Sequence, residues 1–71
     1  MDRSVFQRRL TETEDQIASA EHQIAQQRKV IAERESNGDT ALHARYLLAG
    51  LELLLAARRD SREWLLKQLK T

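Results

Sequence analysis

The sequence predicts an all-α protein: an antiparallel two-helix hairpin that dimerises into a four-helix bundle. The 71 residues include no proline, and Gly38 and Gly50 are the only glycines, so little interrupts a helix. Apolar residues in both halves recur at intervals of three and four, the spacing of an amphipathic helix. One turn-forming segment, residues 36–40, separates the halves. We therefore expect a single domain over residues 1–71, with helices at about 3–36 and 40–69 and a turn at 37–39.

The first helix has two candidate N-caps, Asp2 and Ser4, and Ser4 with Gln7 fits a capping box. Two columns of residues with a seven-residue period follow, and together they form the 3-4 seam of a coiled coil. One column is consistently apolar, whereas the other becomes polar toward its end, so this helix should offer only a narrow apolar stripe. The columns are Leu10, Ile17, Ile24, Ile31 and Phe6, Thr13, Ala20, Gln27, Arg34.

The turn contains residues suited to ending one helix and starting another. Gly38 or Asn37 can adopt the left-handed conformation that closes a helix, and Asp39 or Thr40 can cap the next one. A connection this short makes the two helices antiparallel. Residues whose numbers sum to about 76 should then face each other, to within a helical turn.

The second helix is apolar on two faces. Residues 47–55 hold six leucines in nine positions. On a helical wheel the main face comprises Leu47, Leu48, Leu51, Leu54, Leu55, Leu65, Leu66 and Leu69, and the opposite face comprises Leu42, Tyr46, Ala49, Leu53, Ala57 and Trp64. One narrow partner helix cannot cover both faces, and each leucine left in water forgoes about 1.5–3 kcal/mol of burial.

This excess of apolar surface predicts self-association, with a homodimer as the expected partner arrangement. The predicted oligomer interface consists of Leu47, Leu48, Leu51, Leu54, Leu55, Leu65 and Leu69, with Ile17, Ile24 and Ile31 as the facing residues. A larger homo-oligomer and a larger protein partner are the alternatives, and the second would leave the isolated chain poorly folded.

Two arginines interrupt the leucine-rich face of the second helix. Arg58 and Arg62 should face Glu14 and Glu21, so we interpret these four as polar residues that set the register. Alternatively, the arginines form a basic pocket for a phosphate or carboxylate, or extend their heads into water.

No pattern in the sequence predicts catalysis, a cofactor or a metal site. His22 and His43 lie on separate helices without a second ligand at metal-binding spacing. The acidic cluster of Glu12, Glu14 and Asp15 lacks the Glu-x-x-His signature of metal-binding bundles. We expect a non-enzymatic protein.

Charge and hydropathy predict a cytoplasmic protein without a membrane span. Formal net charge is +1, residues 1–10 lack the apolar run of a secretion signal, and the leucine stretch is shorter than the ~20 residues that cross a bilayer. Residues 58–70 are locally basic, which suggests an alternative function as a small nucleic-acid-binding regulator. The favourable position of cations at a helix C-terminus is the simpler explanation, so nucleic acid is not the expected partner.

The chain resembles a loose group of short bacterial helical-hairpin proteins. The similar segments are residues 22–28, 38–41 and 59–60. This resemblance implies the same hairpin fold and brings no established activity or site residues. The residues themselves favour a small self-associating module for protein–protein interaction or scaffolding.

Overall fold

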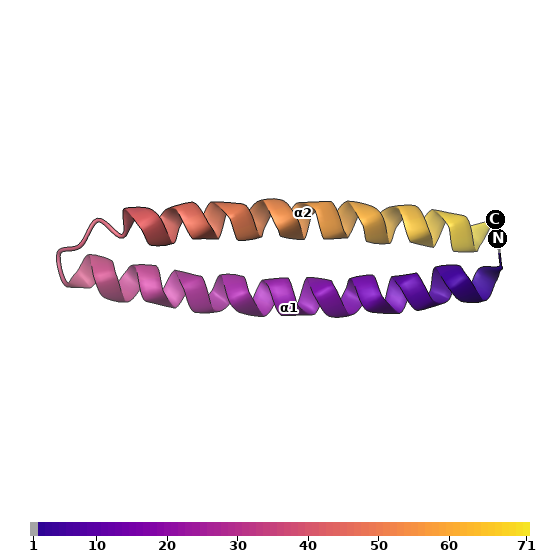
Figure 1. The fold of residues 1–71 in the computed structure, drawn as a ribbon, viewed down its shortest axis with the longest axis horizontal. Coiled ribbons are helices and arrows are strands. Elements are labelled where there is room, and N and C mark those ends of the chain that lie inside the picture. Colours follow the sequence, from indigo (N-terminus) through magenta and orange to yellow (C-terminus); the bar gives the residue numbers. More distant parts are fainter. Residues whose placement is uncertain (1) are drawn as a thin grey trace.

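Two long helices lie side by side and antiparallel in the computed structural model, which describes residues 2–71 (Figure 1). Helix α1 spans Arg3–Ser36 and helix α2 spans Leu42–Lys70. The N- and C-termini meet at one end of the rod and the turn lies at the other. The pair measures 54 × 14 × 13 Å. The described chain contains no strand, so the prediction of an all-α helical hairpin is confirmed.

Asp2 begins α1. Its carboxylate accepts hydrogen bonds from the Ser4 backbone N–H at 3.2 Å and from the Ser4 hydroxyl at 2.9 Å. Of the two N-caps expected from the sequence, Asp2 is the one used. Ser4 lies inside the helix and donates hydrogen bonds to the Asp2 carboxylate. It therefore does not act as the N-cap of a capping box with Gln7.

We expect Asp2 to make the start of α1 sensitive to acid. The hydrogen bonds from Ser4 lower the pKa of the Asp2 carboxyl below its usual value of 3.8. Because the folded-state pKa is the lower one, the cap stabilises the helix above pH 3.8 and loses this effect as pH falls through the folded-state pKa. Protection of the amides at residues 3–6 from exchange, expressed relative to the intrinsic rate at each pH, should fall more steeply from pH 6 to pH 2 in the wild type than in Asp2→Asn, which keeps a capping oxygen but does not titrate. Equal slopes would show that the cap carries no pH dependence.

The turn follows the expected glycine but starts α2 later than expected. Gly38 has a positive φ of 85°, as predicted for the residue that ends α1. The Asp39 carboxylate then accepts the backbone N–H of Ala41 at 2.9 Å, so this N–H is satisfied before α2 begins. Ala41, at φ 53°, is the N-cap residue and has no side-chain cap. The prediction that Asp39 or Thr40 caps the second helix is therefore wrong.

The core is a single 3-4 seam between the helices. Helix α1 contributes Thr13, Ile17, Ala20, Ile24 and Ile31 as its buried residues. Helix α2 contributes the buried Ala44, Leu55 and Leu65, with Leu48 and Leu51 packed against them. The α1 seam predicted from the sequence is therefore confirmed over residues 13–31.

Cross-helix contacts show how the two antiparallel helices are aligned. The Gln27 side-chain amide donates to the Ala44 carbonyl at 3.0 Å, a pair whose numbers sum to 71. The rings of Phe6 and Trp64 lie 5.9 Å apart in an edge-on arrangement, and their numbers sum to 70. The ion pair of Glu21 and Arg59 gives a sum of 80. These sums lie on both sides of the predicted 76, at differences of four to six. The register is therefore centred near the predicted one, but the individual contacts depart from it by more than one turn.

The open end of the hairpin is closed by an arginine. The Arg3 guanidinium donates to the backbone carbonyl of Leu69 at 2.8 Å. This carbonyl belongs to the last turn of α2, whose partial negative charge favours a cation. Arg3 therefore joins the start of α1 to the end of α2.

Candidate interaction surface

Most of the residues predicted to form an oligomer interface lie between the two helices of one chain. Ile17, Ile24 and Leu55 are buried in one apolar cluster, and Leu48 and Leu51 pack against it. Ile31 is buried in a second cluster with Ala41 and Ala44. Leu65 is buried and Leu69 is half-buried. Eight of the ten predicted interface residues are thus placed in the seam of the hairpin itself.

Leu47 and Leu54 are the two members of this set that lie outside the seam. The seam residues of α2 are spaced alternately four and three apart and face α1: Ala44, Leu48, Leu51 and Leu55. Leu47 and Leu54 each precede a seam residue and are 48% and 43% exposed. Their side chains lie with the apolar residues on the side of α2 that faces away from α1, and not in the core.

The result is one continuous apolar surface on α2, which we call the outer face. It consists of Leu42, Tyr46, Leu47, Leu53 and Leu54. Leu42, Tyr46 and Leu53 are 75%, 79% and 74% exposed. At 100° per residue these side chains fall within roughly 140° of the helix circumference. No aspartate, glutamate, lysine or arginine between residues 42 and 57 falls in that arc. The exposed His43 does, and it is neutral in the formal charge count, so the outer face carries no formal charge.

One edge of the hairpin carries a ladder of ion pairs. Arg28 and Glu52 approach to 3.5 Å, and Glu21 and Arg59 approach to 3.4 Å. Arg45 forms the third pair, with Glu35. The numbers of each pair sum to 80, and successive pairs are seven residues apart with alternating sign. The ladder therefore matches the antiparallel register and opposes a shift of one helix by one heptad.

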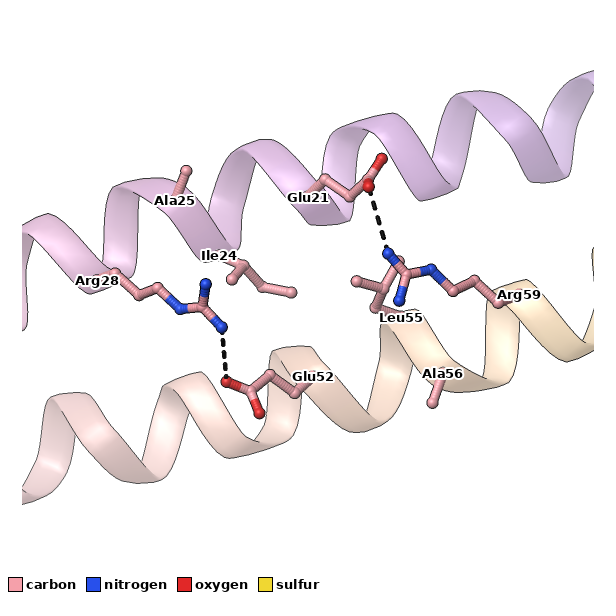
Figure 2. Close-up of a pocket in the computed structure, with 8 residues that line it drawn as sticks. All are labelled: Glu21, Ile24, Ala25, Arg28, Glu52, Leu55, Ala56 and Arg59. Atoms are coloured by element: carbon pink, nitrogen blue, oxygen red, sulfur yellow. Dashed lines mark hydrogen bonds and ion pairs between the residues drawn. The ribbon is translucent and has the colours of Figure 1, made fainter.

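The ladder covers a shallow groove above Ile24 and Leu55 (Figure 2). Two arginines and two glutamates line this groove, and each arginine reaches across to a glutamate on the other helix. The four charges cancel within the groove. It therefore offers no surplus charge for an anion or a cation, and we assign it to the stability and register of the hairpin.

The ladder corrects the residues predicted to set the register. Arg58 and Arg62 are half-buried at the seam, and neither forms an ion pair within residues 2–71. Arg58 lines the opposite edge together with Gln16, Ser19 and Gln23. Glu21 pairs with Arg59 instead, and Glu14 is exposed. The predicted pairing of Arg58 and Arg62 with Glu14 and Glu21 is therefore wrong. Arg59 extends from α2 toward the edge that carries Glu21, whereas Arg58 and Arg62 do not.

We expect each rung of the ladder to contribute little stability alone. The side chains of Glu21 and Arg59 are about half exposed, and exposed ion pairs contribute roughly 0.2–1 kcal/mol. Glu21→Gln should lower the free energy of unfolding by that amount at low salt and by a smaller amount at 1 M NaCl. Urea denaturation at both salt concentrations measures the difference, with Glu33→Gln as an exposed control. A loss of more than about 2 kcal/mol would contradict this prediction, because it exceeds the stability that an exposed ion pair contributes.

The remaining candidate residues are dispersed. His22 and His43 are exposed on different helices. Among the described residues, no group of three or more His, Cys, Asp or Glu side chains is placed to hold a metal ion. Neither helix is both long enough and apolar enough to cross a bilayer over residues 2–71.

The basic residues near the C-terminus do not form one surface. Arg58 and Arg62 lie at the seam and Arg59 is held by Glu21. Lys67 and Lys70 are exposed in the last turn of α2. The seam, the ion-paired edge and the last turn of the helix thus carry these charges, whereas binding a phosphate backbone needs free cations along one side. The arrangement does not favour a nucleic-acid site.

No protein-family model, curated protein or solved structure matches this chain. The resemblance to short bacterial hairpin proteins therefore stays a prediction, and function has to be inferred from the surfaces of the hairpin. The outer face of α2 holds most of the large apolar side chains that remain exposed to water.

Two features were not predicted from the sequence: the full extent of the outer face and the ladder of ion pairs. Tyr46 and Leu53 lay on the recognised weaker stripe but were not included in the predicted interface. The ladder was missed because the seam of α2 was not assigned to a heptad. With that assignment, Arg45, Glu52 and Arg59 form a single column beside the seam, opposite the column of Glu35, Arg28 and Glu21.

Proposed function

We propose that this chain is a small self-associating helical module for protein–protein interaction or scaffolding. In the proposed assembly, two hairpins pack through the outer faces of α2 and form a four-helix bundle. The proposal assigns the chain a binding role and no catalytic one. The observation that carries it is the outer face: five apolar side chains, three of them about three-quarters exposed, on a helix whose other side already fills the core.

The size of the outer face supports this proposal. Monomeric proteins rarely expose contiguous apolar patches larger than a few hundred Å² without a binding role. Isolated hairpins of this length also gain little from their own core, and such chains commonly rely on oligomerisation for stability. Covering the outer face would remove the exposed apolar patch and would also add buried apolar area to the small core.

A second copy is the occupant that the energetics favour. Scaled by exposed fraction, burial of each outer-face side chain contributes roughly 1–2 kcal/mol. A symmetric dimer buries ten of them, for about 10–20 kcal/mol, against an association cost of roughly 4–15 kcal/mol. A partner that covers the face of one copy gains only half of this contribution from these residues.

The charge distribution supports the same arrangement. The edge that carries the three ion pairs is occupied by contacts within the chain, whereas the outer face is uncharged. Two uncharged outer faces can meet without desolvating a charged group, which would oppose association.

Light scattering after size-exclusion chromatography, over a dilution series, tests the proposal. We expect a molar mass of twice 8.2 kDa at high concentration, falling on dilution, with helicity recorded on the same samples. A fully helical species that stays at 8.2 kDa at millimolar concentration would overturn the proposed self-association. A poorly helical chain that folds only on adding another protein would indicate an accessory subunit instead.

A further inference from the structure

Gly50 is not required by anything in its own chain. It lies in the middle of α2, where glycine is the least favourable residue apart from proline. A Cβ added at this position would meet no atom within 4 Å. No contact with α1 and no turn therefore explains the absence of a side chain. A close approach by a group from outside the chain would explain it.

The neighbours of Gly50 turn this position into a hollow in the outer face. On a helix surface, each residue borders those three and four positions away. For Gly50 these are Tyr46, Leu47, Leu53 and Leu54, all exposed and all apolar or aromatic. The hollow has helix backbone as its floor and four large side chains around it. This is the geometry that receives a side chain or a ridge of another helix.

Resting on the self-association proposed above, we propose that a second copy binds here with α2 antiparallel to α2, and that the two helices cross at Gly50. A two-fold axis at this point makes the same patch contact itself. It sets opposite each other residues whose numbers sum to 100. Leu47 then meets Leu53 of the other copy, and Tyr46 meets Leu54, so each ring of four side chains covers the other.

The charges on α2 favour the antiparallel orientation. Asp60 and Lys67 continue the line of Tyr46 and Leu53 along the helix at seven-residue intervals. Parallel packing in register would place Asp60 against Asp60 and Lys67 against Lys67, and like charges in such contacts repel. Antiparallel packing about Gly50 places Asp60 near Thr40 of the other copy. It places Lys67 beyond the N-terminal end of the other copy's α2, so neither residue meets its own counterpart. The opposed helix dipoles add to this preference.

Distances between spin labels at two sites test the orientation and the crossing point. The chain has no cysteine, so Lys67→Cys and Ala56→Cys each give one label per copy at an exposed position outside the ring of four. At 1.5 Å per residue, crossing at Gly50 separates the two copies of position 67 by about 50 Å and those of position 56 by about 20 Å. Parallel packing gives about 8–10 Å between the helix axes at both sites.

The two distances distinguish failure of this inference from failure of the proposed function. A long distance at position 67 with a short one at position 56 supports the crossing at Gly50. Two short distances, or two nearly equal intermediate ones, overturn the inference while self-association stands. Absence of dipolar coupling in a sample that scatters as a monomer overturns both.

Filling the hollow gives a second, independent test. Gly50→Leu should keep or raise helicity, because leucine is a better helix former than glycine and a Cβ at this position meets no atom within 4 Å. It should raise the dimer Kd by about tenfold to a hundredfold, because the second helix can no longer approach closely. The matched control is Ala25→Leu, an equal addition at an exposed position of α1, which should leave the Kd within about twofold. An unchanged Kd in Gly50→Leu, or a larger effect from Ala25→Leu, would place the crossing elsewhere.

Discussion

Replacing Ile24 with alanine should lower the free energy of unfolding by about 2–4 kcal/mol, the largest stability effect expected of a single substitution in this chain. Ile24 is 6% exposed and lies in the cluster with Ile17 and Leu55. The substitution removes three buried carbon atoms from a seam only one layer thick. Few neighbouring side chains are available to move into the space, so most of the cavity remains.

The measurement for Ile24→Ala is urea denaturation followed by circular dichroism, at one fixed chain concentration because dimerisation stabilises the folded state by mass action. Val30→Ala is the matched control. Val30 is 37% exposed and outside both apolar clusters, so its loss should be about 1 kcal/mol or less. Equal losses in the two variants would mean that the seam between α1 and α2 is not the core.

Replacing Leu53 with glutamate should have the largest effect on association. Leu53 is 74% exposed on the hairpin, so the substitution removes little packing within the chain. In the proposed dimer it would remove two buried leucine side chains and place two carboxylates in an uncharged interface. We expect the dimer Kd to rise by at least about a hundredfold, because each lost leucine and each desolvated charge opposes association.

Sedimentation velocity over a concentration series measures this change, with helicity checked at the highest concentration. Ala32→Glu introduces the same charge at an exposed position of α1 and should leave the Kd within about threefold, a difference under 1 kcal/mol. If Leu53→Glu associated as tightly as the wild type, the outer face of α2 would not be the contact surface.

The sequence predicted the elements of this fold well because their signals are local. The bounds of α1, the left-handed Gly38 and the seam of Ile17, Ile24 and Ile31 each depend on residues within one or two turns. The antiparallel register follows from the length of the turn alone. The start of α2 was predicted two residues early, because the Asp39 carboxylate binds the N–H of Ala41 before the helix starts.

The sequence did not show which leucines of α2 face inward. A seam with seven residues per two turns drifts by about 20° per heptad on a wheel drawn at 3.6 residues per turn. Over the length of α2 this drift spreads the seam across a wide arc. Leu47 and Leu54 therefore fell on the same predicted face as Leu48 and Leu55, although the structure places them outside. Assigning the second helix to heptads, as was done for the first, would have separated them.

The arginine pairing was missed for a related reason. Register alone places Arg58 and Arg59 within one residue of each other along the helix axis, both near the level of Glu21. The side on which each side chain leaves the helix decides between them, and that depends on the position of the seam. Arg59 lies on the edge that carries Glu21, whereas Arg58 lines the opposite edge.

Isotope-filtered nuclear Overhauser spectroscopy on an equimolar mixture of labelled and unlabelled chains tests the central claim most directly. It detects only contacts between copies. We predict cross-peaks between the Tyr46 ring protons of one copy and leucine methyl groups of the other, with none from Ile17, Ile24 or Ile31. Inter-copy cross-peaks confined to those isoleucines, or none in a sample shown to be helical, would contradict the claim that the outer face of α2 is covered by a second hairpin.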